Sequence, residues 1–194
     1  MSKIIALTQR VETIEAIQER RDALSQEWAQ LAESCGFIPL LLPNRCSLVE
    51  KMLQKIPPDG ILLTGGNDIG EAPERDETER FLVQYSLENQ IPLLGVCRGM
   101  QMILDFFGTP LQRVTNHARV QHPLSNGDVV NSFHGWGAVE CCPPLVPLAW
   151  SGDKILEAVT HEEYIWVQGI MWHPERYHPL RERDIALLRE VFQL

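Results

Sequence analysis

Short apolar runs alternate with helical patterns through the first half of the chain, and this alternation constrains the fold more than any other feature. Strands are expected at 3–8, 37–42, 60–63 and 91–96, and helices at 24–35, from 47 onward, at 76–89 and at 98–107. The last of these strands is continuously apolar, which is typical of a central strand covered on both faces. About four successive β-α units predict an α/β fold, with a mostly parallel central sheet and helices on both faces.

The pattern changes after Gly108. Short strands are expected at 129–132, 137–140, 156–159 and 164–171, before a last helix at 180–192. These strands are expected to extend the sheet with antiparallel edge strands in the C-terminal half. No repeat or long flexible linker divides the 194 residues, so residues 1–194 are expected to form a single domain.

Composition excludes several classes of partner. Lys and Arg total 17 against 26 Asp and Glu, a formal net charge of −9. Such a chain lacks the positive excess that binds nucleic acid or anionic lipid. The N-terminal apolar run stops after four residues, too short for a signal peptide, so a cytoplasmic protein with no membrane span is expected. The five cysteines, an odd number, are then free thiols.

The strongest local signal for chemistry is Gly95-Val96-Cys97-Arg98-Gly99. It follows a buried strand and opens an apolar helix, the arrangement of a nucleophile elbow with cysteine in the usual place of serine. Glycines on either side remove side chains that would clash in the tight turn. The helix N-terminus favours a thiolate, so Cys97 is the candidate nucleophile.

A second signal is His173-Pro174-Glu175, at the end of the expected strand 164–171. Pro174 biases His173 toward an extended backbone. Glu175 is placed to orient the imidazole, as the third member of a catalytic triad does. Since His173 comes 76 residues after Cys97, only the fold can bring them together.

Two glycines, Gly65 and Gly66, follow the third expected strand. They match neither of the standard phosphate-binding loops. Exposed backbone amides at such a turn suit an oxyanion instead, so the amides of Gly66, Asn67 and Arg98 are the candidate oxyanion donors.

Taken together, five segments resemble the class I glutamine amidotransferase-like superfamily, and within it the γ-glutamyl hydrolases of the peptidase C26 type. The segments are Leu63-Thr64-Gly65-Gly66-Asn67-Asp68, Arg75-Asp76-x-x-Glu79, Gly95-Val96-Cys97-Arg98-Gly99-Met100-Gln101, Val130-Asn131-Ser132-Phe133-His134 and Met171-Trp172-His173-Pro174-Glu175. The resemblance implies a flavodoxin-like fold and a Cys97-His173-Glu175 triad. It also implies attack of Cys97 on a γ-glutamyl amide and a glutamyl thioester that water hydrolyses.

The chain departs from that pattern where Gly135-Trp136-Gly137 follows His134, which indicates a different pocket for the leaving group. Thr8-Gln9-Arg10, Asn116-His117-x-Arg119 and Met171 to Arg176 are similar to γ-glutamyl-CDP-amidate hydrolases of capsular phosphoramidate synthesis. That similarity implies a nucleotide-linked small-molecule substrate. The candidate substrate-binding residues are Arg10, Arg98, Gln101, Arg119, Asn131, Ser132 and His134, with Arg113 and Arg176 as further cations.

No cofactor is expected, and no metal. His117 and His122 could join Cys141-Cys142 as ligands, but these adjacent cysteines lack the spacing of zinc ligands. Three alternatives stay open: a γ-glutamyl-γ-aminobutyrate-type hydrolase, a glutaminase subunit that supplies ammonia to a partner synthetase, and a non-catalytic binding protein. The sequence does not fix the leaving group or the oligomeric state.

Overall fold

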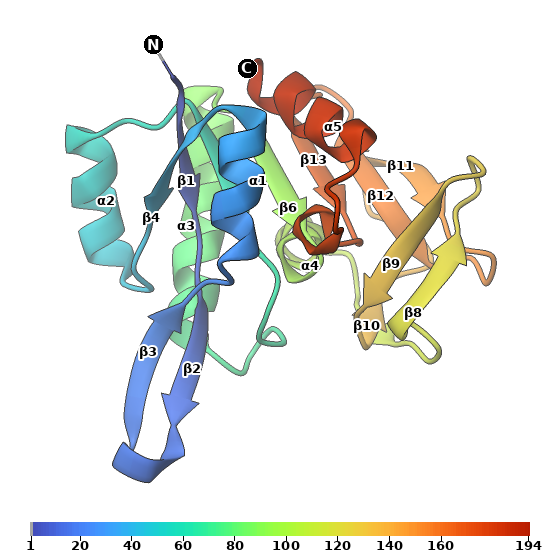
Figure 1. Ribbon diagram of the computed structural model, residues 1–194, viewed down its shortest axis with the longest axis horizontal. Coiled ribbons are helices and arrows are strands. Elements are labelled where there is room, and N and C mark those ends of the chain that lie inside the picture. Colours follow the sequence, from blue (N-terminus) through green and yellow to red (C-terminus); the bar gives the residue numbers. More distant parts are fainter. Residues whose placement is uncertain (1) are drawn as a thin grey trace.

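A seven-stranded sheet forms the centre of the protein, whose computed structural model describes residues 2–194 (Figure 1). The strand order is β11-β12-β13-β6-β5-β1-β4. Five strands run parallel: β1 (Ile4–Leu7), β4 (Ile38–Leu41), β5 (Gly60–Leu63), β6 (Leu93–Val96) and β13 (Val167–Ile170). The strands β12 (Leu156–His161) and β11 (Leu145–Trp150) continue the sheet in antiparallel pairing. The predicted mostly parallel sheet with antiparallel strands in the C-terminal half is confirmed.

Helices cover both faces of the sheet. On one face α1 (Glu27–Cys35) packs beside α5 (Glu182–Phe192). On the other face α3 (Pro73–Asn89) lies between α2 (Cys46–Lys55) and α4 (Arg98–Phe106). Successive residues of the central strands point to opposite faces, so Leu62 and Leu94 enter the α1–α5 core while Ile61, Leu63 and Leu93 enter the other. Two fully buried apolar layers follow from the continuous apolar runs of these strands.

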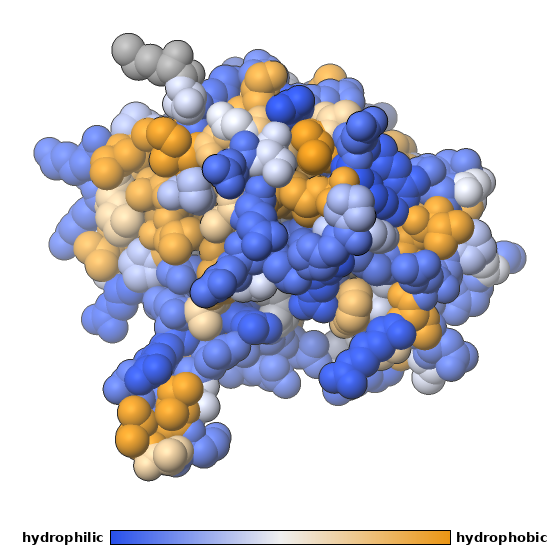
Figure 2. All heavy atoms as spheres, viewed as in Figure 1, coloured by the Kyte–Doolittle hydropathy of each residue, from blue (hydrophilic) through white to orange (hydrophobic). Residues whose placement is uncertain are grey.

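Three small antiparallel pairs surround the sheet. The hairpin of β2 (Arg10–Ile14) and β3 (Glu19–Ala23) projects from the body, joined at its tip by the short helix η1 (Glu15–Ile17). Figure 2 shows apolar side chains at this tip, where Ile17 is exposed. Beyond α4, β8 (Ala118–Pro123) pairs with β9 (Val129–Phe133), and β7 (Gln112–Arg113) pairs with β10 (Trp136–Gly137).

The elements predicted for the first half match the structure to within a few residues, apart from the unpredicted hairpin of β2 and β3. The helix expected from residue 47 onward is α2, which begins at Cys46; its N-cap is Arg45, without a side-chain cap. None of the helices in residues 2–194 combines the length and apolarity needed to cross a membrane.

Candidate active site

The strand β6 ends in a tight turn into α4, with Cys97 at the bend. Cys97 has φ +53° and ψ −107°, a backbone conformation that non-glycine residues rarely adopt. A Cβ on Gly95 would stand 2.5 Å from the backbone of Gly99, and one on Gly99 would collide with the carbonyl oxygen of Leu63. The two glycines therefore permit the close strand-helix approach that produces the elbow.

His173 lies just before the short helix η2 (Pro174–Arg176), and its ring is paired with Glu175. The His173 Nδ1 atom is 2.7 Å from the Glu175 Oε1 atom. Burial alone would lower the pKa of His173, but the charge and hydrogen bond of Cys97, together with Glu175, raise this pKa to about 9. Cys97 and His173 also line the same pocket, where a thiolate and an imidazolium would stabilise one another.

Neighbouring strands fix the position of His173. Asn131, on β9, holds the backbone of His173 with two hydrogen bonds. The Asn131 Oδ1 atom accepts from the His173 amide at 2.8 Å, and the Asn131 Nδ2 atom donates to the His173 carbonyl at 2.9 Å. On the other side the ring packs against Gly65, where a Cβ would lie 2.6 Å from the His173 Cε1 atom. The backbone and the ring of His173 are thus both constrained.

The loop after β5 supplies the other wall of the site. Gly66, with φ +116°, and Asn67 line the same pocket as Cys97. The Asn67 side chain bonds both the amide and the carbonyl of Val11, which ties this loop to the base of β2. The amide of Arg98 is in the first turn of α4, where N–H groups lack an intrahelical acceptor. Gly66, Asn67 and Arg98 line one pocket with Cys97, and their role as oxyanion donors stays a prediction.

A buried charge cluster lies behind this wall. Arg75 donates to the carbonyls of Thr64 and Gly65 and pairs with Glu79 at 2.9 Å. The Arg98 side chain, 1% exposed, pairs with Asp76 and Glu79. The Arg98 side chain was also predicted to bind substrate. Its ion pairs instead direct the guanidinium group into the protein interior, and its backbone amide is the group that remains as a candidate donor to the pocket.

The pocket above Cys97 has a volume of about 470 Å³. It is polar, and its lining residues come from five separate parts of the chain: Gly66, Asn67, Asp68 and Glu71; Cys97, Arg98 and Gln101; Ala118 and Arg119; Phe133, His134 and Gly135; His173 and Arg176. The carboxyl ends of the parallel strands meet here, which is where ligands bind in open α/β sheets.

The remaining predicted substrate residues divide into three groups. Gln101, Arg119 and His134 line the pocket. Ser132 is fully buried and donates to the His117 carbonyl at 2.6 Å, and Asn131 is occupied with His173, so both position other residues. Arg10 belongs to a small adjoining cavity of about 20 Å³ and pairs with Glu12 at 2.8 Å.

Sequence reasoning missed three acidic or aromatic side chains of the pocket. Asp68 and Glu71 lie in the loop after β5, and Phe133 ends β9. The Arg176 guanidinium covers the Phe133 ring, with its Cζ atom 4.4 Å from the ring centroid. A loop acidic residue and an exposed aromatic at the end of a strand carry no signal of their own in a single sequence.

A comparison with protein families agrees with this geometry. The peptidase C26 family model matches residues 3–126 and 113–175, and the chain belongs to the peptidase C26 family.

Among individual relatives, the chain is 31% identical to the γ-glutamyl-CDP-amidate hydrolase of Campylobacter jejuni, over 98% of each chain. It is 27% identical to a γ-glutamyl-γ-aminobutyrate hydrolase of Escherichia coli O157:H7, over 88% of this chain and 84% of the relative.

Solved structures share the fold. A Thermoplasma acidophilum protein assigned as a GMP synthase subunit covers 100% of this chain and 94% of its own, with a TM-score of 0.77 and 16% identity. The glutaminase domain of Trypanosoma brucei CTPS, solved with bound acivicin, covers 99% of this chain and 94% of its own, with a TM-score of 0.68 and 14% identity. The chain therefore has the class I glutamine amidotransferase-like fold.

Proposed function

We propose that this protein hydrolyses a γ-glutamyl amide, with Cys97 as the nucleophile, His173 as the proton carrier and Glu175 as the residue that orients the ring. The observation that carries the proposal is the meeting of the Cys97 elbow and the His173–Glu175 pair at one polar pocket. Membership of the peptidase C26 family and the names of its relatives support it.

The first half of the reaction follows from this arrangement. The Cys97 thiolate attacks the γ-carbonyl carbon, and the negative oxygen that forms accepts hydrogen bonds from the backbone amides of Gly66 or Asn67 and of Arg98. The protonated His173 ring then gives its proton to the leaving nitrogen. The carbon–nitrogen bond breaks, the amine departs, and a glutamyl thioester remains on Cys97.

The second half uses the same groups in reverse. The now neutral His173 ring takes a proton from water, whose oxygen attacks the thioester carbonyl. The carbon–sulfur bond breaks, L-glutamate is released and Cys97 returns to the thiolate form beside a protonated His173. Glu175 keeps the ring in one orientation throughout and stabilises its cationic form.

The substrate we propose is a γ-glutamyl amide joined to a nucleoside diphosphate, as in γ-glutamyl-CDP-amidate. Arg119 and Arg176 bring two cations to the pocket, and guanidinium groups suit phosphate oxygens. Phe133, 38% exposed, offers an aromatic face beside them for a base. Asp68 and Glu71, which also line the pocket, suit the glutamyl ammonium group.

A panel assay tests the proposal. The purified protein would be given a γ-glutamyl nucleotide amidate, γ-glutamyl-γ-aminobutyrate and glutamine, and glutamate release would be measured. We expect a kcat/KM for the nucleotide amidate at least about 100-fold above the others, because lost charged contacts each cost about 1.5–3 kcal/mol. Release of glutamate from none of the three would overturn the assignment, and a preference for glutamine would favour the glutaminase alternative.

Two variants separate chemistry from leaving-group binding. Cys97→Ser should reduce turnover of every substrate below about 1% of wild type, since a serine hydroxyl is not activated by this pair. Cys142→Ser, at a partly exposed thiol outside the pocket, is the matched control. Arg119→Ala should raise KM for the nucleotide amidate and spare γ-glutamyl-γ-aminobutyrate, whereas the exposed Arg45→Ala should change neither.

A further inference from the structure

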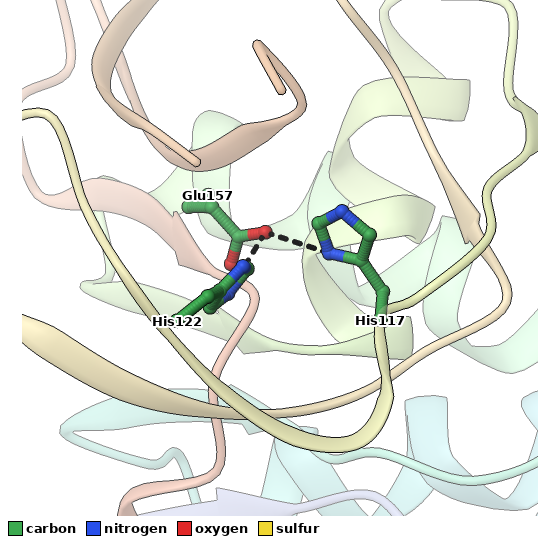
Figure 3. Close-up of side chains that lie close together, drawn as sticks. All are labelled: His117, His122 and Glu157. Atoms are coloured by element: carbon green, nitrogen blue, oxygen red, sulfur yellow. Dashed lines mark ion pairs between the residues drawn. The ribbon is translucent and has the colours of Figure 1, made fainter. Parts of the chain in front are cut away.

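Three histidines surround one buried carboxylate between the β8–β9 hairpin and the main sheet. His117 precedes β8 and His122 lies on it, His134 follows β9, and Glu157 lies on β12. Figure 3 shows the rings of His117 and His122 turned toward the Glu157 carboxylate. The reaction proposed above uses none of the atoms that converge here. We call these four residues the His-Glu cluster.

The facing atoms of the His-Glu cluster are buried without hydrogen bonds. Glu157 is fully buried, His117 and His134 are at most 3% exposed, and the His122 side chain is 14% exposed. Within residues 2–194, neither Glu157 oxygen has a hydrogen-bond partner, nor do the inner ring nitrogens, which are Nδ1 of His117, Nε2 of His122 and Nε2 of His134. Unsatisfied buried polar groups are costly, so their convergence on one point requires a physical reason.

Distances distinguish a metal site from a hydrogen-bonded cluster. The Glu157 Oε1 atom is 3.4 Å from His117 Nδ1, 3.5 Å from His122 Nε2 and 3.4 Å from His134 Nε2. Charge-assisted hydrogen bonds are shorter, about 2.7–2.9 Å. In a tetrahedral zinc site with bonds of about 2.0–2.1 Å, neighbouring ligand atoms are about 3.3–3.5 Å apart.

Two of the three outer ring nitrogens are already engaged. The His134 Nδ1 atom is 2.9 Å from the carbonyl oxygen of Trp136, and the His117 Nε2 atom is 3.1 Å from an oxygen of Asp153. A carbonyl only accepts, so Nδ1 of His134 carries the hydrogen and Nε2 of the neutral ring turns a lone pair toward the carboxylate. Metal-binding histidines are held in this way by outer carboxylates and carbonyls.

We propose that the His-Glu cluster binds a divalent transition-metal ion of the zinc class. Three imidazole nitrogens and one carboxylate oxygen suit zinc better than magnesium or calcium, which prefer oxygen ligands alone. The donor atoms of His117, His122 and Glu157 lie within 4.8 Å of one another. Two ligand atoms of one zinc ion are at most about 4.2 Å apart. Because 4.8 Å exceeds this limit, zinc binding requires the less buried His122 ring to move inward.

The ion would join the β8–β9 hairpin to the main sheet. That hairpin carries Arg119 and Phe133 into the pocket and, through Asn131, holds His173. The role is structural, and it extends beyond the proposed hydrolysis. The sequence pattern predicted no metal, because the adjacent cysteines were the only apparent partners of His117 and His122, while Glu157 lies 35 residues beyond His122 in an apolar strand.

The test uses protein carrying Cys97→Ala, so that zinc captured by Cys97 and His173 cannot be mistaken for the site. We expect about one zinc per chain by elemental analysis, and a Tm that rises by about 5–10 °C with zinc at about 100 times Kd. A cobalt-substituted sample should show the visible absorption of tetrahedral nitrogen and oxygen ligands. These measurements do not depend on turnover, so their outcome is independent of whether the hydrolase proposal is correct.

Substitutions locate the ion. His122→Ala, at the least buried ligand, should fold and lose the zinc-dependent rise in Tm, and Glu157→Gln should lose it as well. His178→Ala, at an exposed histidine outside the cluster, should keep it. Less than about 0.1 zinc per chain with no rise in Tm, or an equal rise in His122→Ala, would overturn the site.

Discussion

Cys97 occupies a backbone conformation that typically costs about 1–3 kcal/mol, and its neighbours hold it there. The strained turn places the sulfur at the N-terminus of α4 and beside the His173 ring, whose pKa it raises. The placement of Cys97, His173 and Glu175 at one site could be anticipated from sequence, because glycines and proline mark the backbone that each chemical group needs, and their catalytic roles stay a prediction. The ion pairing of the Arg98 side chain could not be predicted from sequence, because its partners Asp76 and Glu79 lie on another helix.

The coupling between Cys97 and His173 predicts an unusual titration. The His173 ring should gain and lose its proton near pH 9, compared with about 6.5 for an ordinary histidine. It is therefore cationic below that pH, ready to protonate a leaving group, and becomes neutral as the pH rises through 9. Nuclear magnetic resonance of labelled histidine measures the midpoint directly.

The matched comparison is Cys97→Ala against Cys142→Ser. Removing the Cys97 sulfur should lower the His173 midpoint, because the largest cause that raises this pKa is lost. The Cys142 variant should leave the midpoint unchanged. A midpoint near 6.5 in the wild-type protein would show that no thiolate–imidazolium pair exists.

Among the elements, the loop after β5 has the strictest steric requirement. A methyl group on Gly65 would stand 2.6 Å from the His173 ring, which Glu175 holds in place. Gly65→Ala should therefore displace the ring and lower kcat by about 10²-fold, the cost typical of a misplacement of about 1 Å. Circular dichroism should remain that of the folded wild type.

Gly152 provides the control for this substitution. A Cβ there meets nothing within 4 Å, so Gly152→Ala should keep wild-type kcat. An activity of Gly65→Ala within about threefold of wild type would mean that the ring can move aside freely, and that the loop does not fix its position.

Three of the strands that sequence reasoning missed, β2, β3 and β8, share a physical cause. The hairpin of β2 and β3 is largely exposed, and its charged residues Glu12, Glu19, Arg20 and Arg21 leave no apolar face to produce an alternating pattern. The strand β8 is exposed at five of six positions. An apolar run identifies strands that are buried on both faces, as β5 and β6 are, but it gives no signal where pairing alone defines the strand.

For the molecule as a whole, stability depends on charge as well as on the two apolar layers. Glu79 is fully buried and faces both Arg75 and Arg98, which joins α3 to α4 and to the loop after β5. The substitution Glu79→Gln removes the carboxylate that pairs with the buried guanidinium groups of Arg75 and Arg98. We expect the free energy of unfolding in urea to fall by about 3–5 kcal/mol, the cost of breaking a buried pair.

Glu77→Gln, at an exposed position on the same helix, should change that free energy by less than about 0.5 kcal/mol. A loss below about 1 kcal/mol in Glu79→Gln would show that water or rearrangement compensates the cluster. The formal net charge of −9 does not reveal this interior arrangement, since composition says nothing about where opposite charges meet.

The site combines a cysteine from the middle of the chain with an imidazole that comes 76 residues later. At about 5–20 residues per second, a ribosome needs about 4–15 s to make that interval. During this time the nascent chain carries a thiol without the histidine that we propose activates it. Under the proposed mechanism, the sulfur therefore becomes reactive only when the late strands dock.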